Sequence, residues 1–317
     1  MDRELHVVFG AGQVGTPLTA RLLADGKRVR VVKRSAGGAA PGAELMLGDA
    51  ANTTFCQQAA TAAAAVYHCM NPPYDAAIWA ALVPRYMENL ITAAGRAGAR
   101  LVVLDNLYML GRTGGRPMNE DTPINPCSKK GEVRARTAER LLDAHQRGEV
   151  RAVLGRASDY YGPGGALTYV GDYFWKPALA GRIVWSPVDP DAIHTYHYIP
   201  DVAAGLALLG NAEEDVLGQA WMLPCRPPET LRDLVKRLSE ALGREIKLGT
   251  IPRWILQAMG LFVPLVREMN EMLYQWDAPF VVDDRRFRAR FEMRPAGADE
   301  AARETVAWAR ERYGVRR

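Results

Sequence analysis

The sequence predicts an α/β protein: a doubly wound parallel sheet with a smaller, mostly helical C-terminal lobe. Three observations predict it. Short β-branched runs alternate with alanine-rich helical stretches in the first half, a glycine-rich loop follows the first run, and the alternation stops near residue 165. Strand–helix alternation is typical of a parallel sheet covered by helices on both faces, and right-handed crossovers make such a sheet doubly wound.

Each expected element follows from local composition. Runs rich in Val, Leu and other strand formers predict strands at 5–9, 28–33, 44–49, 64–70, 100–106 and 150–158. Helical periodicity and alanine content predict helices at 16–25, 76–98, 128–149, 194–210 and 230–243. After "YYGPGG" the chain becomes rich in aromatic residues and proline, and from about Pro227 it is mostly helical and polar.

Size and composition indicate an ordinary soluble globular protein. Of 317 residues, 48% are hydrophobic and 24% are charged, and the net charge is +4. Basic and acidic residues are interspersed, so we expect no nucleic-acid partner. The longest apolar run, 254–266, is broken by Gly260 and Pro264. It is shorter than the ~18 residues of a membrane span, so we expect no membrane partner.

The amino terminus and the cysteines bear on the cellular compartment. The first residues enter a strand without the layout of a signal peptide. The four cysteines are scattered and form no C-x-x-C pair. We therefore expect free thiols in a cytoplasmic protein.

A glycine loop follows the first strand and opens the first helix. In "VVFGAGQVGTPL", Gly10, Gly12 and Gly15 have G-x-G-x-x-G spacing, with Gln13 and Val14 between the last two. Gly10 is expected to make the tight turn, Gly12 to let a pyrophosphate approach the backbone, and Gly15 to let the helix pack close to the strand. The unpaired N–H groups of the helix then face the phosphates. The loop predicts a Rossmann-like dinucleotide site.

The residues at the end of the second strand and just after it indicate which dinucleotide binds. An NAD site usually has Asp or Glu here, whereas this chain has Lys33, Arg34 and Ser35. These side chains suit a 2′-phosphate, so NADP(H) is favoured over NAD(H). The alternative is that they are surface charges beyond the strand. Asp49, after the third strand, is a candidate acceptor for the adenine amino group.

The glycine loop and the change of rhythm predict two parts of the chain. Residues 1–165, with 194–225 returning to them, form the expected dinucleotide-binding domain. Residues 166–193 and 226–317 form the expected substrate lobe. This lobe is rich in aromatic residues, which favours a small apolar or aromatic substrate.

Five features in this order resemble the extended short-chain dehydrogenase/reductase family: the glycine loop, residues 64–74, the strand at 100–106, "YYGPG" and "YIPDVA". The family includes UDP-sugar epimerases, dehydratases and NAD(P)-dependent reductases. The resemblance covers roughly residues 5–210, and "VAWARERYG" is similar to the family's last helix. It implies a nicotinamide cofactor, and a homodimer formed through the helices after the fourth and fifth strands.

The resemblance also assigns the catalytic positions. Family members use a Ser or Thr after the fifth strand and a Tyr-x-x-x-Lys on the next helix. Here "PCSKKGEVR" puts Lys130 at the tyrosine position and Arg134 at the lysine position, and "VVLDNLYMLG" puts Asn106 at the serine position. All three are substituted, which identifies the chain as an atypical member.

Three interpretations follow from these substitutions. The first is an oxidoreductase with a rebuilt acid–base set. In it Tyr108 supplies the phenol, Lys130 donates a proton or favours the phenolate by its charge, Asn106 supports them, and Arg134 holds the ribose. The second is an NADP(H)-binding sensor or subunit without turnover. The third is a redox-neutral step such as epimerisation or elimination.

Residues after the fourth strand are further candidates for the nicotinamide side of the site. Asn71 and Pro72 are expected to contact the cofactor and Tyr74 the substrate. Asp105, at the end of the fifth strand, either faces the site or caps the following turn.

The residues after the sixth strand include candidate substrate contacts and a pair of histidines further on. Ser158, Asp159 and Tyr160 are candidate substrate contacts at the carboxyl edge of the sheet, the alternative being a simple turn. His194 and His197 form H-x-x-H without a third ligand nearby in the sequence, so we expect a structural pair and no metal.

Overall fold

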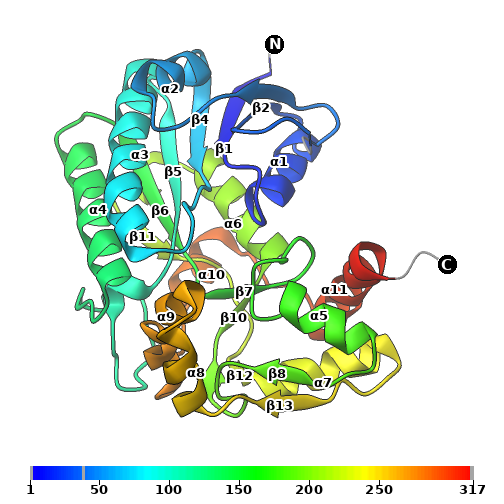
Figure 1. The fold of residues 1–317 in the computed structure, drawn as a ribbon. Coiled ribbons are helices and arrows are strands. Elements are labelled where there is room, and N and C mark those ends of the chain that lie inside the picture. The colour runs from blue at the N-terminus through cyan, green and yellow to red at the C-terminus, as the bar shows by residue number, and fades with distance from the viewer. Residues whose placement is uncertain (1–2, 38–39, 315–317) are drawn as a thin grey trace. The chain divides into compact units, whose positions relative to one another are not determined.

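The computed structural model describes residues 3–37 and 40–314, and they form two compact units (Figure 1). The first unit comprises the chain up to Gly111 together with 124–157 and 202–223. The second unit comprises 112–123, 158–201 and 224–317. The chain therefore crosses between the units several times, and the segment 112–123 belongs to the second.

A parallel sheet forms the centre of the first unit and confirms the predicted fold class. Within the described residues it has seven strands in the order β11-β6-β5-β4-β1-β2-β3, and every neighbouring pair is parallel. The strands are β1 (Leu5–Phe9), β2 (Arg28–Lys33), β3 (Glu44–Leu47), β4 (Ala63–His68), β5 (Arg100–Asp105), β6 (Arg151–Arg156) and β11 (Ala220–Met222). The chain order reverses at β1, as in doubly wound sheets.

Helices cover both faces of this sheet. Figure 1 shows α2, α3 and α4 on one face and α1 and α6 on the other. Their bounds are α1 (Gly15–Ala24), α2 (Thr53–Ala60), α3 (Ala76–Ala97), α4 (Lys129–Gln146) and α6 (Ile199–Asn211), and short 3-10 turns occur at η1 (Tyr108–Leu110) and η2 (Glu214–Val216).

Side-chain caps fix where α3 and α4 begin. The carboxylate of Asp75 accepts a hydrogen bond from the Ile78 N–H at 2.9 Å, and the Ser128 hydroxyl accepts one from the Gly131 N–H at 3.0 Å. Each cap satisfies an N–H group that has no partner within its own helix. The caps set the first turns of both helices, which carry the candidate site.

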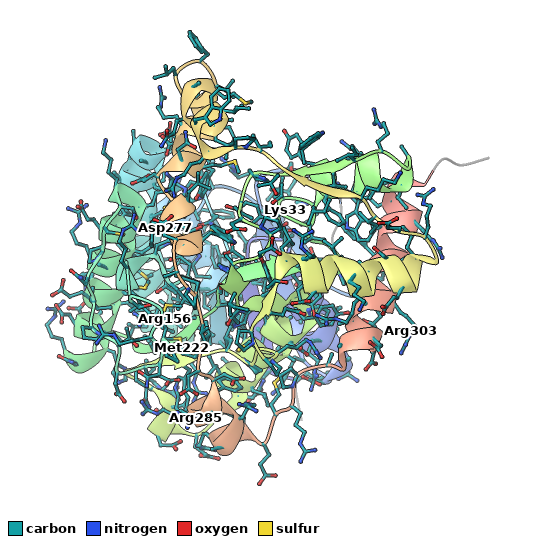
Figure 2. All side chains as sticks on the ribbon, turned by 90° about the horizontal axis from the view of Figure 1, so that it is seen from below. Lys33, Arg156, Met222, Asp277, Arg285 and Arg303 are labelled. Carbon is teal, nitrogen blue, oxygen red and sulfur yellow. The ribbon has the colours of Figure 1, made fainter. Side chains whose placement is uncertain are left out.

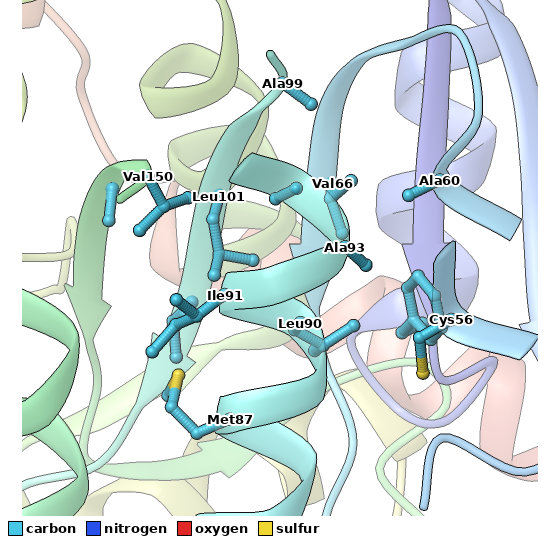
Figure 3. Packing of buried hydrophobic residues seen from close by; sticks show 14 of the residues in the cluster. Cys56, Ala60, Val66, Met87, Leu90, Ile91, Ala93, Ala99, Leu101 and Val150 are labelled. Atoms are coloured by element: carbon cyan, nitrogen blue, oxygen red, sulfur yellow. The ribbon is translucent and has the colours of Figure 1, made fainter. Parts of the chain in front are cut away.

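The core of the first unit lies between the sheet and α2–α3. Figure 3 shows Leu90, Ile91 and Met87 of α3 packed over the sheet face that carries Val66 and Leu101. These side chains are buried, as are their neighbours. Burial of apolar surface on this scale makes the sheet a rigid platform for the loops at its edge.

The second unit is built from short strands and helices around its own core. Its strands pair two by two, β7 with β10 and β8 with β13 in parallel and β9 with β12 antiparallel. Its elements are β7 (Asp159–Tyr161), α5 (Asp172–Leu179), β8 (Val184–Ser186), β9 (Ile193–His194), β10 (Tyr196–Tyr198), β12 (Glu229–Thr230), α7 (Leu231–Leu242), β13 (Leu248–Thr250), α8 (Arg253–Gly260), α9 (Pro264–Asn270), η3 (Leu273–Trp276), α10 (Arg285–Phe291) and α11 (Ala298–Tyr313). Figure 2 adds the side chains to these elements.

One predicted helix begins later than expected. The sequence predicts a helix over 194–210, but Tyr196–Tyr198 form β10 and α6 begins at Ile199. The run "HTYHY" is aromatic and β-branched, and its backbone pairs with β7 from Asp159 to Tyr161. Tertiary strand pairing therefore overrides the helical interpretation for these residues.

Candidate active site

The candidate site lies at the carboxyl ends of three neighbouring strands in the first unit. The glycine loop follows β1, residues 69–74 follow β4, and Asn106 and Tyr108 follow β5. These strands are adjacent in the order β5-β4-β1. Open parallel sheets bind their ligands at this edge, next to the reversal of strand order.

The three glycines have the geometry that the sequence predicts. Gly10 has a φ of +103°, and a Cβ atom there would lie 2.9 Å from the Cys69 carbonyl oxygen. A Cβ atom on Gly15 would lie 1.7 Å from the Gly10 carbonyl oxygen, whereas one on Gly12 would meet nothing within 4 Å. The tight turn and the close packing are thus confirmed, and the open side of the loop is at Gly12.

The start of α1 leaves room for an anion. Val14 occupies the N-cap position, and no side chain among the described residues caps this helix. Val14 is buried, and Gln13 before it is partly exposed. An uncapped helix amino terminus behind an open glycine suits the pyrophosphate of a dinucleotide. The residues present therefore fit such a cofactor.

The basic residues at the end of β2 and just after it lie at or near the surface. Arg34 and Ser35 are exposed, and the Lys33 ammonium donates a hydrogen bond to the Gly37 carbonyl at 2.5 Å. Asp49 is also exposed, and one of its carboxylate oxygens accepts the Ala51 N–H at 2.9 Å. Arg34 and Ser35 remain candidates for a 2′-phosphate, and the choice between NADP and NAD stays a prediction.

The first turns of α4 bury two cations on one face of the helix. Lys130 is fully buried and Arg134 is nearly so, and four residues separate them, so they lie on the same helix face. The Lys130 ammonium lies 4.8 Å from the centre of the Tyr74 ring, and the Arg134 guanidinium 4.8 Å from that of Trp79. Such cation–π contacts stabilise a cation that has left water.

A buried carboxylate lies between two arginines beside this face. One Asp105 oxygen lies 3.6 Å from Arg134 and the other 3.5 Å from Arg156. Arg134 also donates a hydrogen bond to the Asn71 side-chain oxygen. Asp105 therefore faces the site, while the backbone turn after β5 is capped by another residue. Buried charges need such partners because their desolvation is costly.

That other residue is Asn106, which shapes the loop that carries Tyr108. The Asn106 side-chain oxygen accepts the Tyr108 N–H at 3.1 Å, an Asx turn. Behind the loop, a Cβ atom on Gly131 of α4 would lie 2.5 Å from the Tyr108 carbonyl oxygen. Only glycine permits this approach, so the loop and the first turn of α4 are in close contact.

Two phenols meet in this site. The hydroxyl oxygens of Tyr74 and Tyr108 are 3.5 Å apart. The Tyr108 ring stacks on Trp79 with centroids 6.2 Å apart, and the Tyr74 ring meets Trp79 edge-on at 5.8 Å. Sequence reasoning missed Trp79. The available signal was helical spacing, since Trp79 and Val83 are buried one turn apart on α3.

Burial sets the protonation of two groups next to the glycine loop. Burial, with the nearby Arg134 charge, lowers the pKa of His68 to about 3, and the neutral ring accepts the Met70 N–H at 3.2 Å. Burial raises the pKa of the Cys69 thiol to about 12. Burial therefore favours the neutral thiol of Cys69 over the thiolate, which is the nucleophilic form.

The candidates after β6 belong to the second unit. The Asp159 carboxylate accepts a hydrogen bond from His194 Nε2 at 2.8 Å, and the Ser158 hydroxyl lies 3.3 Å from the same nitrogen. His197 Nδ1 accepts the Ser158 N–H at 3.0 Å. Because serine and aspartate meet one imidazole nitrogen, the group is no Ser-His-Asp relay. Tyr160, on the same short strand, is partly exposed.

The histidine pair has a structural environment. His194 is fully buried and stacks between Trp276 and Phe280 at centroid distances of 4.6 and 5.0 Å. Within 3–37 and 40–314, no three His, Cys, Asp or Glu side chains gather as metal ligands would. The four cysteines are free thiols.

Fold and site together define a dinucleotide-binding α/β protein of the extended short-chain type. The profile of the NAD-dependent epimerase/dehydratase family matches residues 6–222. The chain belongs to this family, whose members use a nicotinamide dinucleotide.

Two solved structures are similar to nearly the whole chain, and one sequence relative is similar to about two thirds of it. UDP-glucuronic acid decarboxylase 1 of Danio rerio is 25% identical over 240 residues, which is 66% of this chain and 54% of that protein. The chain thus spans about half the length of this relative. A dTDP-glucose 4,6-dehydratase from Streptomyces venezuelae, solved with NAD bound, matches with TM-score 0.78, 18% identity and 98% of both chains covered. MoeE5, solved with UDP-glucose and NAD, matches with TM-score 0.76 and 20% identity over 97% of this chain and 99% of that one.

No α-helix in the described ranges combines the length and the apolar character that crossing a bilayer requires.

Proposed function

We propose that the chain is an NADP(H)-dependent oxidoreductase that acts on a small apolar or aromatic carbonyl or hydroxyl substrate. The observation that carries the proposal is the Tyr74–Tyr108 pair, whose hydroxyl oxygens are 3.5 Å apart beside the buried Lys130. The pair follows β4 and β5, next to the glycine loop. A bound nicotinamide would supply or accept the hydride.

In this proposal Tyr108 exchanges a proton with the substrate oxygen. Tyr74 is its neighbouring phenol and a substrate contact, and the Lys130 ammonium over the Tyr74 ring favours negative charge on the pair. Asn106 holds the Tyr108 loop through its Asx turn. The usual Ser-Tyr-Lys set is thus replaced by two tyrosines and a lysine from different elements.

The cofactor contacts are proposed on both sides of β1. Gly10, Gly12, Gln13, Val14 and Gly15 face the pyrophosphate. Pro72 borders the nicotinamide, and Asn71 with its hydrogen-bonded Arg134 holds the nicotinamide ribose. The exposed Arg34 and Ser35, with Lys33, bind the 2′-phosphate, and Asp49 binds the adenine. The absence of an acid at 33–35 supports NADP over NAD.

The remaining proposals concern the substrate and the assembly. Ser158, Asp159 and Tyr160 are proposed substrate contacts. The chain forms a cytoplasmic homodimer through α3 and α4, which are tied together by the Arg140–Glu88 ion pair at 2.7 Å. Light scattering of the purified protein tests the dimer.

A redox-neutral reaction is the second candidate. Two of the similar proteins are by name a sugar-nucleotide dehydratase and a decarboxylase, and the family includes epimerases. Such a reaction would leave the amount of reduced cofactor unchanged after each turnover. The third candidate, a sensor without turnover, rests on the three substituted positions.

One experiment separates the three. NADPH and NADH are titrated by fluorescence, and a carbonyl panel is then screened for NADPH oxidation and, by mass spectrometry, for product. Oxidation lost in Tyr108→Phe, yet retained in the exposed control Tyr173→Phe, supports the proposal. Product without net oxidation favours the redox-neutral reaction, and tight binding without product favours the sensor. No binding of either dinucleotide overturns all three.

A further inference from the structure

The helical hairpin formed by α8 and α9 exposes a cluster of large apolar side chains. Phe262 is 86% exposed, Leu261 77% and Trp254 70%. We call the exposed group the hairpin tip; it consists of Trp254, Met259, Leu261, Phe262, Val263 and Leu265. Exposed apolar residues are ordinary when they are scattered, but here six of them lie on one short hairpin, which is typical of an interaction surface.

The hairpin is a well-packed structure that presents this tip. Asn270 in α9 donates a hydrogen bond from its side-chain nitrogen to the Leu256 carbonyl in α8 at 2.9 Å. A Cβ atom on Gly260 would lie 3.2 Å from the Arg267 Cα, so the two helices approach closely. Leu256 itself is buried. Figure 2 shows side chains pointing outward from this hairpin, with Asp277 labelled on the adjoining segment.

Charge is distributed in a pattern that suits one kind of partner. From Trp254 to Val266 there is no charged residue, and the first charges on either side are the exposed Arg253 and Arg267. At the base of the hairpin, Asp277 is shared by Arg253 at 2.5 Å and Arg112 at 2.6 Å, so two cations oppose one carboxylate.

The nearest acids on α9 and after it do not reverse this pattern. Glu268 and Glu271 are only partly exposed, whereas Arg267 is exposed. An uncharged tip with Trp and Phe, bordered by arginines, has the layout of segments that insert at a membrane surface: the apolar residues enter the acyl boundary and the arginines meet anionic headgroups.

We propose that the hairpin tip docks the protein on an anionic phospholipid membrane by shallow insertion. The helices are too short to cross the bilayer, so the protein lies on the surface. The proposal revises the expectation that no membrane takes part, and it holds whether or not the chain turns over a substrate. A second copy of the chain is the other occupant, which the test distinguishes.

The test is co-sedimentation of the full chain with vesicles of phosphatidylcholine alone and with vesicles of phosphatidylcholine and anionic phosphatidylglycerol, whose negative surface attracts basic residues. Wild type should bind the anionic vesicles. The double variant Leu261→Ser/Phe262→Ser should partition at least about tenfold less, because two large apolar side chains no longer insert. Arg253→Gln and Arg267→Gln should each weaken binding about fivefold.

The matched control is Tyr173→Ser, an 85% exposed aromatic residue on α5, outside the hairpin. It should bind within about twofold of wild type, and circular dichroism should show that all variants are folded, since exposed side chains add little to stability. In addition, Trp254 emission should shift to the blue with anionic vesicles, and Trp254→Phe should lose that shift.

Three results overturn the proposal. The first is no vesicle binding by wild type. The second is an equal loss in Tyr173→Ser, which indicates non-specific adhesion. The third is a vesicle-free oligomer, seen by light scattering, that the tip variant dissociates, which assigns the tip to contact between copies of the chain.

Discussion

The guanidinium of Arg134 lies 3.6 Å from the carboxylate of Asp105, and both side chains are almost fully buried. The same carboxylate faces Arg156 at 3.5 Å. One negative charge thus lies between two positive charges in the interior of the first unit, and Arg134 also donates a hydrogen bond to Asn71.

Replacing Asp105 by Asn should destabilise the protein by about 3 to 5 kcal/mol, because two buried arginines then lose the carboxylate that faces them both. Urea unfolding followed by circular dichroism measures the change. Asp191→Asn, which removes an exposed pair with Arg232 at 2.7 Å, is the control and should change little. Equal effects of the two variants would contradict the importance of the buried network.

Gly12→Ala and Gly15→Ala should fail in different ways. A Cβ atom at Gly15 meets the Gly10 carbonyl at 1.7 Å, so Gly15→Ala should lower the melting temperature by several degrees or prevent folding. A Cβ atom at Gly12 meets no protein atom within 4 Å, so Gly12→Ala should melt like wild type. It should nevertheless bind NADPH at least about tenfold more weakly, because the methyl group occupies the approach of the pyrophosphate. Unchanged NADPH binding in Gly12→Ala would remove the loop from the cofactor site.

Lys130→Met separates chemistry from stability. Lys130 is fully buried, and a methionine of similar length keeps most of the packing of its aliphatic chain, so the variant should still fold. Turnover, once a substrate is found, should fall about a hundredfold, since the Tyr74–Tyr108 pair loses its cation. The exposed neighbour Lys129 provides the matched control, Lys129→Met. Full activity in Lys130→Met would exclude Lys130 from the proton-transfer set.

His68 should make the protein sensitive to acid. Burial lowers its pKa from 6.5 to about 3 in the folded state, so between those pH values the unfolded chain binds a proton that the native chain does not. The free energy of unfolding therefore falls as the pH decreases from about 6.5 toward 3, by up to about 1.4 kcal/mol per pH unit for this group. His68→Asn should flatten the dependence by that amount in urea titrations at several pH values. A slope that does not change would mean that His68 titrates normally in the folded protein.

The sequence predicts best what depends on near neighbours in the chain. The spacing of Gly10, Gly12 and Gly15 and the period of the strands and helices are local, and the structure agrees with them. The period of α4 also puts Lys130 and Arg134 on one face. It does not distinguish the buried Lys130 from the exposed Lys129, because that depends on Tyr74, more than fifty residues earlier.

What sequence reasoning missed arises from contacts between distant segments. Trp79 stacks on Tyr108, and Asp105 lies between arginines from α4 and β6. The strand Tyr196–Tyr198 exists because Asp159–Tyr161 pairs with it. In each case the partner is at least 29 residues away along the chain, so no local pattern identifies it.

The close approach of Gly131 to the Tyr108 carbonyl couples the η1 loop to the first turn of α4. With no side chain between them, a shift in either the η1 loop or the first turn of α4 displaces the other. Positions 108 and 130 also share a neighbour, because the Lys130 ammonium lies over the Tyr74 ring and the Tyr108 hydroxyl lies 3.5 Å from the Tyr74 hydroxyl. Restoring the family pattern should therefore require changes at 108 and 130 together, and the two substitutions should be strongly non-additive in a double-mutant cycle.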